Sequence, residues 1–283
     1  MAEAPELAQG LSVAQLLAAV ENELIPRLML SHAGDARAAA AESPPAEPPV
    51  PPERAVWAAP AEIGAFAAWC AGGEERRMSG HVSGLLARGV GLDAIYLHLL
   101  APAARHLGEQ WVRDEVSFVD VQLGLSHLHR LVCDCGSIDF HVGDDAGPGP
   151  GGATRSILLA AAPGEMHTFG VTLAAEFFRR HGWQVSNLCG LGVDFLLERV
   201  ATTHYTAAGF SLHGDGCYEA LAGTIRTVRE RSRNDALLVL VGGDYFARHP
   251  ECVRTVGADL AADDAHRAVF AAEGALGGGA ARP

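Results

Sequence analysis

The strongest constraint on this chain is a change in the spacing of its apolar residues near residue 153. Beyond it, short apolar runs alternate with helical patterns. The apolar runs lie at 156–162, 183–188, 207–212 and 236–241. The helical patterns lie at 168–181, 194–203, 217–232 and 263–273. The runs are bounded by glycine or proline, and several are too apolar for a sheet with one solvated face. This alternation predicts a doubly wound parallel α/β domain over 154–276.

The preceding part of the chain, 57–137, keeps the helical spacing throughout. It predicts four helices, at 60–72, 76–89, 92–111 and 118–136, with a kink in the third at Pro102. Ser117 and Asp120 are placed to cap the fourth helix. The predicted fold class is therefore α/β plus all-α, with a helical bundle followed by the α/β domain.

Two segments rich in proline and glycine separate the predicted parts. Residues 44–52 read PPAEPPVPP and predict an extended linker over 34–56, and residues 143–152 read GDDAGPGPGG and predict a second linker over 138–153. The first part, 1–33, predicts one helix that opens at Ser12 and carries an apolar face of Leu16, Val20, Leu24 and Leu28. That face is expected to pack on the bundle or in a partner's groove. Residues 277–283 are expected to form a flexible tail.

Charge and composition exclude several functions. With 34 acidic residues against 21 basic ones, the net charge is −13 and no basic cluster is present, so direct DNA binding by this chain is not expected. All the basic residues are arginine, which excludes a lysine Schiff base and a P-loop lysine. No apolar run approaches the roughly 20 residues of a membrane span, and the N-terminus does not resemble a signal peptide. We expect a cytoplasmic protein with reduced cysteines.

The loops after three predicted strands carry the residues suited to bind a ligand. They are Glu165, His167 and Gly170 after the first strand, Ser211 and His213 after the third, and Gly242 and Gly243 after the fourth. The carboxyl ends of parallel strands share one edge, so these residues are expected to form one site. An imidazole two residues after a carboxylate suits a metal ligand. His167 as an ordinary loop histidine, His213 as a surface residue and the two glycines as a tight turn are the structural alternatives.

The spacing of these residues resembles a known family. Glu165-x-His167-x-x-Gly170 is followed forty residues on by Ser211-x-His213, and after twenty-eight more by Gly242-Gly243. This pattern is similar to the D-x-H-x-x-G, S-x-L and G-G motifs of cobalamin-binding domains, which have a flavodoxin/Rossmann-like fold. The resemblance implies cobalamin as the cofactor, in its adenosyl, methyl or hydroxo form, with His167 as the lower axial ligand of cobalt.

The helical part extends the resemblance. Residues 95–111 look like the helical cap that precedes cobalamin domains in methionine synthase and in photoreceptors of the CarH type, and Trp111 stands where a tryptophan covers the upper face of the corrin. Bundle core is the alternative role for Trp111. Two departures are visible: Glu165 replaces an aspartate, and Val121 and Gln122 stand where CarH-type photoreceptors have a Glu-His pair. His127 and His129 are the nearest substitutes for that histidine.

The architecture, without any DNA-binding module, resembles AerR and PpaA, antirepressors of purple photosynthetic bacteria that act on the repressor CrtJ or PpsR. The resemblance implies a light-responsive regulator of photosynthesis genes that binds a CrtJ/PpsR-type repressor and reaches DNA only through it, and that is not an enzyme. A corrinoid protein of a methyltransferase system is the alternative function. Heme in place of cobalamin is the less favoured cofactor.

Overall fold

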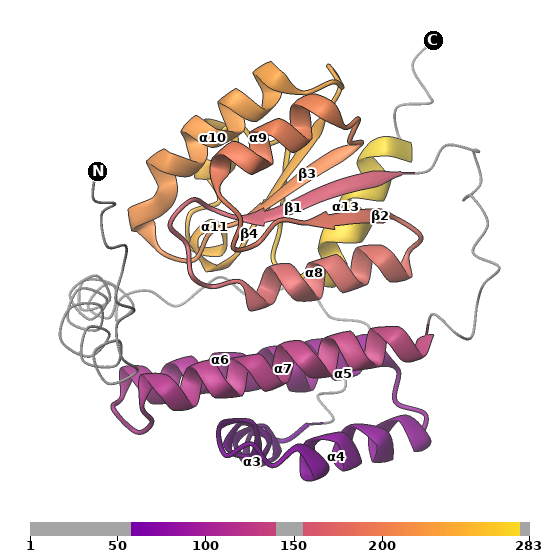
Figure 1. Ribbon diagram of the computed structural model, residues 1–283, viewed down its shortest axis with the longest axis vertical. Coiled ribbons are helices and arrows are strands. Elements are labelled where there is room, and N and C mark those ends of the chain that lie inside the picture. The colour runs from indigo at the N-terminus through magenta and orange to yellow at the C-terminus, as the bar shows by residue number, and fades with distance from the viewer. Residues whose placement is uncertain (1–57, 140–154, 278–283) are drawn as a thin grey trace, which may run out of the picture. The chain divides into compact units, whose positions relative to one another are not determined.

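The computed structural model describes residues 58–139 and 155–277, which lie in one compact unit (Figure 1). The predicted N-terminal helix, the first linker, nearly all of the second linker and the tail lie outside the described residues. Within the described ranges, no helix is both long enough and apolar enough to span a lipid bilayer.

The helical region contains the four predicted helices, and the third is divided. The elements are α3 (Pro60–Ala71), α4 (Glu75–Ala87), α5 (Leu92–Ile95), the π-helical segment η3 (Tyr96–Leu100), α6 (Ala101–Val112) and α7 (Phe118–Asp139). Proline cannot donate an N–H to an α-helical turn, and the departure from α geometry lies directly before Pro102 as the wider turns of η3.

The cap predicted for α7 is present. Oδ2 of Asp120 accepts hydrogen bonds from the backbone N–H of Ser117 at 3.0 Å and from its hydroxyl at 2.7 Å. The Ser117 hydroxyl in turn accepts the Asp120 N–H at 3.2 Å. These reciprocal bonds stabilise the start of α7 and so fix the turn that connects it to α6.

The second region is the predicted doubly wound parallel sheet, with strand order β2-β1-β3-β4-β5. Its strands are β1 (Ser156–Ala161), β2 (Gln184–Asn187), β3 (Ala207–Ser211), β4 (Leu238–Gly242) and β5 (Leu260–Ala262). Its longer helices are α8 (Phe169–Arg180), α9 (Val193–Thr202), α10 (Tyr218–Arg231) and α13 (Ala265–Gly277), and its short ones are η4 (Asp215–Cys217), α11 (Asp244–Arg248) and α12 (Cys252–Thr255). Strand β5, which the analysis above did not predict, has three residues and no bulky β-branched side chain.

The register of the sheet aligns the ends of its central strands. Ala161 at the end of β1 pairs with Ser211 of β3, and Ser211 pairs with Gly242 of β4. The connection from β1 leads outward to β2, whereas β3 lies on the other side of β1. The three motif-bearing loops therefore leave the sheet at one level, beside the point where the strand order reverses, which is where ligands of such sheets bind.

Two apolar cores form, one on each face of the sheet. Helices α9 and α10 cover one face, and α8 and α13 cover the other (Figure 1). The second core continues without a break into the helical region, where α7 lies along α8. The ring of Tyr96 in η3 packs edge-on against Phe177 of α8 with centroids 5.9 Å apart, and Nε of Arg180 lies 3.1 Å from Oδ1 of Asp93. The helical region is thus packed directly on the α/β region.

Candidate cofactor site

The loop after β1 presents a carboxylate–imidazole pair. Nδ1 of His167 lies 2.6 Å from Oε1 of Glu165, and the same oxygen accepts the backbone N–H groups of Met166 and His167 at 2.8 and 2.9 Å. An ionised carboxylate only accepts, so Nδ1 is the donor and the lone pair of the neutral ring lies on Nε2. The Glu165 side chain is 5% exposed and that of His167 is 50% exposed. The buried carboxylate therefore orients the imidazole, and the imidazole remains partly accessible to solvent.

The second oxygen of Glu165 joins this loop to the loop after β3. Oε2 accepts the backbone N–H of His213 at 2.8 Å and that of Gly214 at 3.3 Å. Burial alone would raise the pKa of Glu165, but the hydrogen bonds from the His167 side chain and from the backbone N–H groups of His167 and His213 lower it to about 2. The carboxylate is consequently ionised across the physiological range and holds two loops together.

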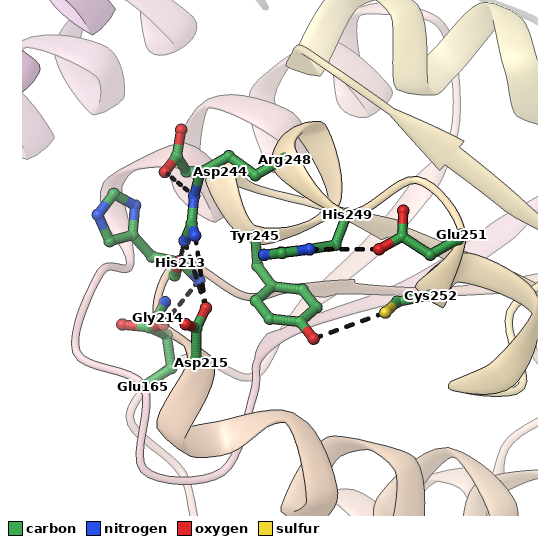
Figure 2. Close-up of polar contacts among 10 residues, drawn as sticks. All are labelled: Glu165, His213, Gly214, Asp215, Asp244, Tyr245, Arg248, His249, Glu251 and Cys252. Carbon is green, nitrogen blue, oxygen red and sulfur yellow. Dashed lines mark hydrogen bonds and ion pairs between the residues drawn. The ribbon is translucent and has the colours of Figure 1, made fainter. Parts of the chain in front are cut away.

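His213 packs against His167. Its ring is stacked on that of His167, with centroids 4.1 Å apart and planes tilted by 33°. Burial, with the neighbouring His167 as a second cause, lowers the pKa of His213. Figure 2 shows the polar contacts of the β3 loop, in which Glu165, Asp215 and Arg248 surround the backbone of residues 213 and 214. The structure thus brings Glu165, His167 and His213 together.

Gly243 is required by the backbone at the end of β4. It has φ +99°, and a Cβ there would overlap the carbonyl oxygen of Leu212. A Cβ at Gly242 would lie 3.0 Å from the carbonyl oxygen of Ala262. The glycine pair therefore lets β4 end in close contact with the loops on both sides of it.

A cavity of about 170 Å³ lies between the sheet and the helices α8 and α13. Four of the predicted site residues line it, namely Gly170, Ser211, Gly242 and Gly243. Most of the remaining wall is apolar, with contributions from Leu159, Val171, Phe178, Phe210, Leu240 and Ala268. Gly170 contributes open space, since an added Cβ would meet no atom within 4 Å. A flat apolar group attached to a polar chain would fit this cavity.

Trp111 lies at the end of α6 and is half-buried. Its ring packs against that of Phe118, the first residue of α7, with centroids 5.9 Å apart. Trp111 does not line the cavity described above. Its proposed place over a corrin stays a prediction.

The two histidines named as substitutes on α7 have different surroundings. Nδ1 of His127 donates to the carbonyl of Cys70 in α3 at 2.9 Å, and its Nε2 lies 3.8 Å from Glu75. His127 is therefore held within the helical region. The ring of His129 packs edge-on against Phe169, the first residue of α8, with centroids 5.1 Å apart. Of the two, His129 is the one that contacts α8.

The charged residues that surround the site were not predicted from the sequence. Arg248 on α11 bridges Asp244 and the loop of His213 and Asp215. Two of these residues, Asp215 and Asp244, stand directly beside the glycine motifs, and that adjacency was the available signal. Arg248 carries no such signal, because only the turn of α11 brings it back to the strand ends.

The fold and this site define the class of protein. Residues 155–270 match the family model of the B12 binding domain, so this part of the chain is similar to such domains. A curated relative from Rhodobacter capsulatus, described as an uncharacterized 20.5 kDa protein in the bchF-crtJ intergenic region, is 29% identical over 175 residues. The matched segment covers 62% of this chain and 88% of that relative.

One solved structure shares the fold of this chain. The monomethylamine corrinoid protein of Methanosarcina barkeri superposes with a TM-score of 0.57 at 16% identity, covering 77% of this chain and 99% of that one. A cobalamin-binding protein from Desulfitobacterium hafniense gives a TM-score of 0.41 at 17% identity, covering 75% and 97% of the two chains. The similarity to the first includes the helical region as well as the sheet.

The residues at the strand ends fit a corrinoid. An imidazole with its Nδ1 proton held by a buried carboxylate presents Nε2 as a nitrogen ligand for a metal. The cavity lined by Gly170, Ser211 and the glycine pair offers apolar walls, and Gly170 leaves open space that a side chain would fill. Both features suit a cofactor that combines a metal centre with a flat heterocycle.

Proposed function

We propose that this protein is a cobalamin-binding, light-responsive regulator of transcription that acts as an antirepressor. The observation that carries the cofactor part is the Glu165–His167 pair, together with the apolar cavity, in a region similar to B12-binding domains. When bound, the cofactor would supply an upper cobalt bond that light breaks or exchanges. The particular upper ligand is left open among the adenosyl, methyl and hydroxo forms.

The chain's own residues divide the work of holding the corrinoid. His167 offers Nε2 to cobalt, and Glu165 keeps the proton on Nδ1. Ser211, Gly242 and the walls of the cavity between the sheet and the helices α8 and α13 would hold the nucleotide tail. Trp111 would cover the corrin, and Trp111→Ala is expected to change the rates of upper-ligand exchange at cobalt more than the melting temperature.

The regulatory part is supported by the relative and by the charge. The Rhodobacter relative is named for its place between bchF and crtJ, and CrtJ is the repressor on which the antirepressors that this sequence resembles act. A net charge of −13 disfavours direct contact with phosphates. We infer that the partner is a CrtJ/PpsR-type repressor and that the protein reaches DNA only through it.

A corrinoid protein of a methyltransferase system is the second candidate function. The fold of the Methanosarcina corrinoid protein matches both the helical and the α/β region, which favours this alternative. It would use the same His167 and cavity, so the partner distinguishes the two functions. Heme on the same scaffold is distinguished from cobalamin by the absorption spectrum.

The first experiment tests the cofactor. The purified chain is mixed with each cobalamin form, and its affinity and its light-minus-dark absorption spectrum are recorded. We expect base-off binding, which His167→Ala abolishes or weakens by at least tenfold. His204→Ala, a change of an exposed histidine near the start of β1, is the matched control. Unchanged affinity and an unchanged cobalt-ligand spectrum in His167→Ala would contradict the assignment of His167 as the cobalt ligand.

The second experiment tests the regulatory role. Mobility shifts on photosynthesis-gene promoter DNA are run with this protein alone, with the repressor alone and with both, in light and in darkness. The repressor's occupancy is expected to change only when the cobalamin-loaded protein is present. Sequence-specific binding by this protein alone contradicts the proposal, as does a repressor that ignores it in every cofactor and light state.

A further inference from the structure

We propose that Arg248, on the surface helix α11, is a positioning residue for the imidazole of His167. The contacts of Arg248 described above are to Asp244 and to the loop of His213 and Asp215. It acts through the loop after β3, in two steps of hydrogen bonding and one ring contact. The part of this inference that concerns cobalt rests on the proposed function, whereas the part that concerns the imidazole does not.

The first step ties Arg248 to two strand ends. Its Nη2 donates to the backbone carbonyl of His213 at 3.1 Å, and its Nε donates to Oδ2 of Asp244 at 3.0 Å (Figure 2). Both terminal nitrogens also lie 3.5 Å from Oδ1 of Asp215. Asp244 directly follows Gly243 at the end of β4, so the guanidinium clamps the β3 loop to the neighbouring strand end.

The second step passes from the β3 loop to the imidazole. The peptide N–H of His213, whose carbonyl Arg248 holds, donates to Oε2 of Glu165, and the N–H of Gly214 does the same. The other oxygen of that carboxylate holds Nδ1 of His167 at 2.6 Å. Residue 213 is therefore fixed at its N–H by Glu165 and at its carbonyl by Arg248.

A ring contact provides a second link from residue 213 to the imidazole. The His213 ring is stacked on His167 at 4.1 Å, so a shift of residue 213 moves the surface that packs against the imidazole. One displacement would thus disturb both the carboxylate that holds His167 and the ring beside it. Groups that orient a ligand histidine from outside typically change metal affinity by about 10- to 100-fold when removed.

Because the Arg248 ion pairs are exposed to solvent, their effect on the imidazole can be measured without unfolding the protein. The side chains of Arg248, Asp215 and Asp244 are 39%, 56% and 53% exposed, so the ion pairs contribute little to stability. Arg248→Gln is consequently expected to fold. The chain also offers a matched control in Arg229, which donates to the carbonyl of Gly257 at 2.9 Å and to Asp259 at 2.7 Å. That clamp has the same chemistry but lies beside Leu237, at the start of β4.

The experiment compares wild type, Arg248→Gln, Arg248→Lys and Arg229→Gln in the full chain. Cobalamin affinity and the fraction of cobalt ligated by imidazole are measured by absorption and by electron paramagnetic resonance of the Co(II) form. We expect Arg248→Gln to weaken affinity about tenfold and to lower the ligated fraction. Arg248→Lys is expected to recover part of both, and Arg229→Gln to leave both unchanged. Equal values in Arg248→Gln and Arg229→Gln would overturn the proposal.

A second measurement uses the protein without cofactor. Long-range ¹H–¹⁵N spectra report whether the His167 ring holds its proton on Nδ1 in a single environment. Wild type and Arg229→Gln are expected to show one Nδ1–H form, and Arg248→Gln is expected to show a mixture. If wild type binds no cobalamin, the proposed function fails, and these spectra alone decide whether Arg248 positions His167. An unmixed Nδ1–H form in Arg248→Gln would then refute the positioning role.

Discussion

Glu165 shows how one methylene changes the reach of a residue. The cobalamin-binding motif that this sequence resembles has aspartate at this position. Here the longer side chain places one oxygen on His167 and the other on the backbone of residues 213 and 214. Five hydrogen bonds converge on one buried carboxylate. The glutamate therefore serves both as the support of the imidazole and as the link between two loops.

Shortening this residue is expected to separate the two roles. In Glu165→Asp the carboxylate cannot reach both loops, and the partly buried N–H groups of residues 213 and 214 lose their acceptor. The free energy of unfolding of the apoprotein should fall by about 1–3 kcal/mol, measured by urea denaturation. Glu198→Asp, a change on the exposed face of α9, is the control and should leave stability within about 0.5 kcal/mol. A stability of Glu165→Asp equal to wild type would show that the second loop finds another partner.

Gly243 occupies a position where the backbone conformation and the neighbouring carbonyl both require glycine. Gly243→Ala puts a Cβ at φ +99° and against the Leu212 carbonyl, which should cost about 3 kcal/mol or more. Gly80→Ala in α4, where a Cβ meets nothing within 4 Å, should instead stabilise by up to about 1 kcal/mol. Thermal unfolding of both variants measures the contrast. A Gly243→Ala variant as stable as wild type would contradict the strained geometry.

Helix α8 is the element that joins the two regions, and it carries a buried charge. Glu176 is 4% exposed and lies beneath Gly136 of α7, where a Cβ would come within 2.5 Å of its Oε1. That oxygen accepts no hydrogen bond from the described residues. Burial raises the pKa of Glu176, and Arg179, 3.6 Å from its other oxygen, offsets this only in part. Close packing of α7 on α8 thus comes with an under-satisfied carboxyl.

The sign of the pH dependence follows from this raised pKa. A carboxyl whose pKa is higher in the folded state adds stability at low pH, and that stability is lost as the pH rises through the folded-state pKa. Glu176→Gln is neutral at every pH and should exceed wild type at pH 7 by on the order of 1 kcal/mol. The difference should vanish below about pH 4.5. Urea denaturation from pH 4 to pH 8 measures it, with Glu198→Gln as an exposed control; a pH-independent difference would contradict the mechanism.

Most elements could be predicted because their apolar residues repeat with a clear period. The four strands predicted from apolar runs are present, and each begins and ends within two residues of its predicted bounds. The same holds for the four helices predicted after residue 153, except that α13 ends later than predicted, at Gly277 rather than at residue 273. The short elements could not be predicted. Strand β5 has three residues, and α11 and α12 have five and four, which is too few for a period to show. They form because β4 and its neighbours position them.

The site was predictable to the extent that it follows strand ends. Parallel strands bring their carboxyl ends together, so the meeting of Glu165, His167 and His213 followed from the alternation of elements. The walls of the cavity come from α8, α13 and four strands, and Arg248 returns to the site through a turn of α11. Such positions depend on how elements pack in three dimensions, which spacing along the chain does not encode.

At the scale of the whole molecule, the core that spans both regions predicts cooperative unfolding. Phe177 on α8 contacts the Tyr96 ring of the helical region and is fully buried. Phe177→Ala should lower stability by about 3–5 kcal/mol. Fluorescence of the tryptophans in the helical region and of Trp183 in the α/β region should shift together in denaturant. Two separate transitions, with only one moved by the substitution, would show that the regions fold independently.

The continuous core also implies that the covalent link between the regions is dispensable for their association. A chain cut between residues 140 and 154 would give two fragments, each exposing an apolar face that its counterpart covers. Coexpressed, they are expected to recombine into a non-covalent complex with the circular dichroism of the intact chain. The cut molecule would then be a split protein, and a sensor whose assembly is controlled by bringing its two fragments together could be built from it.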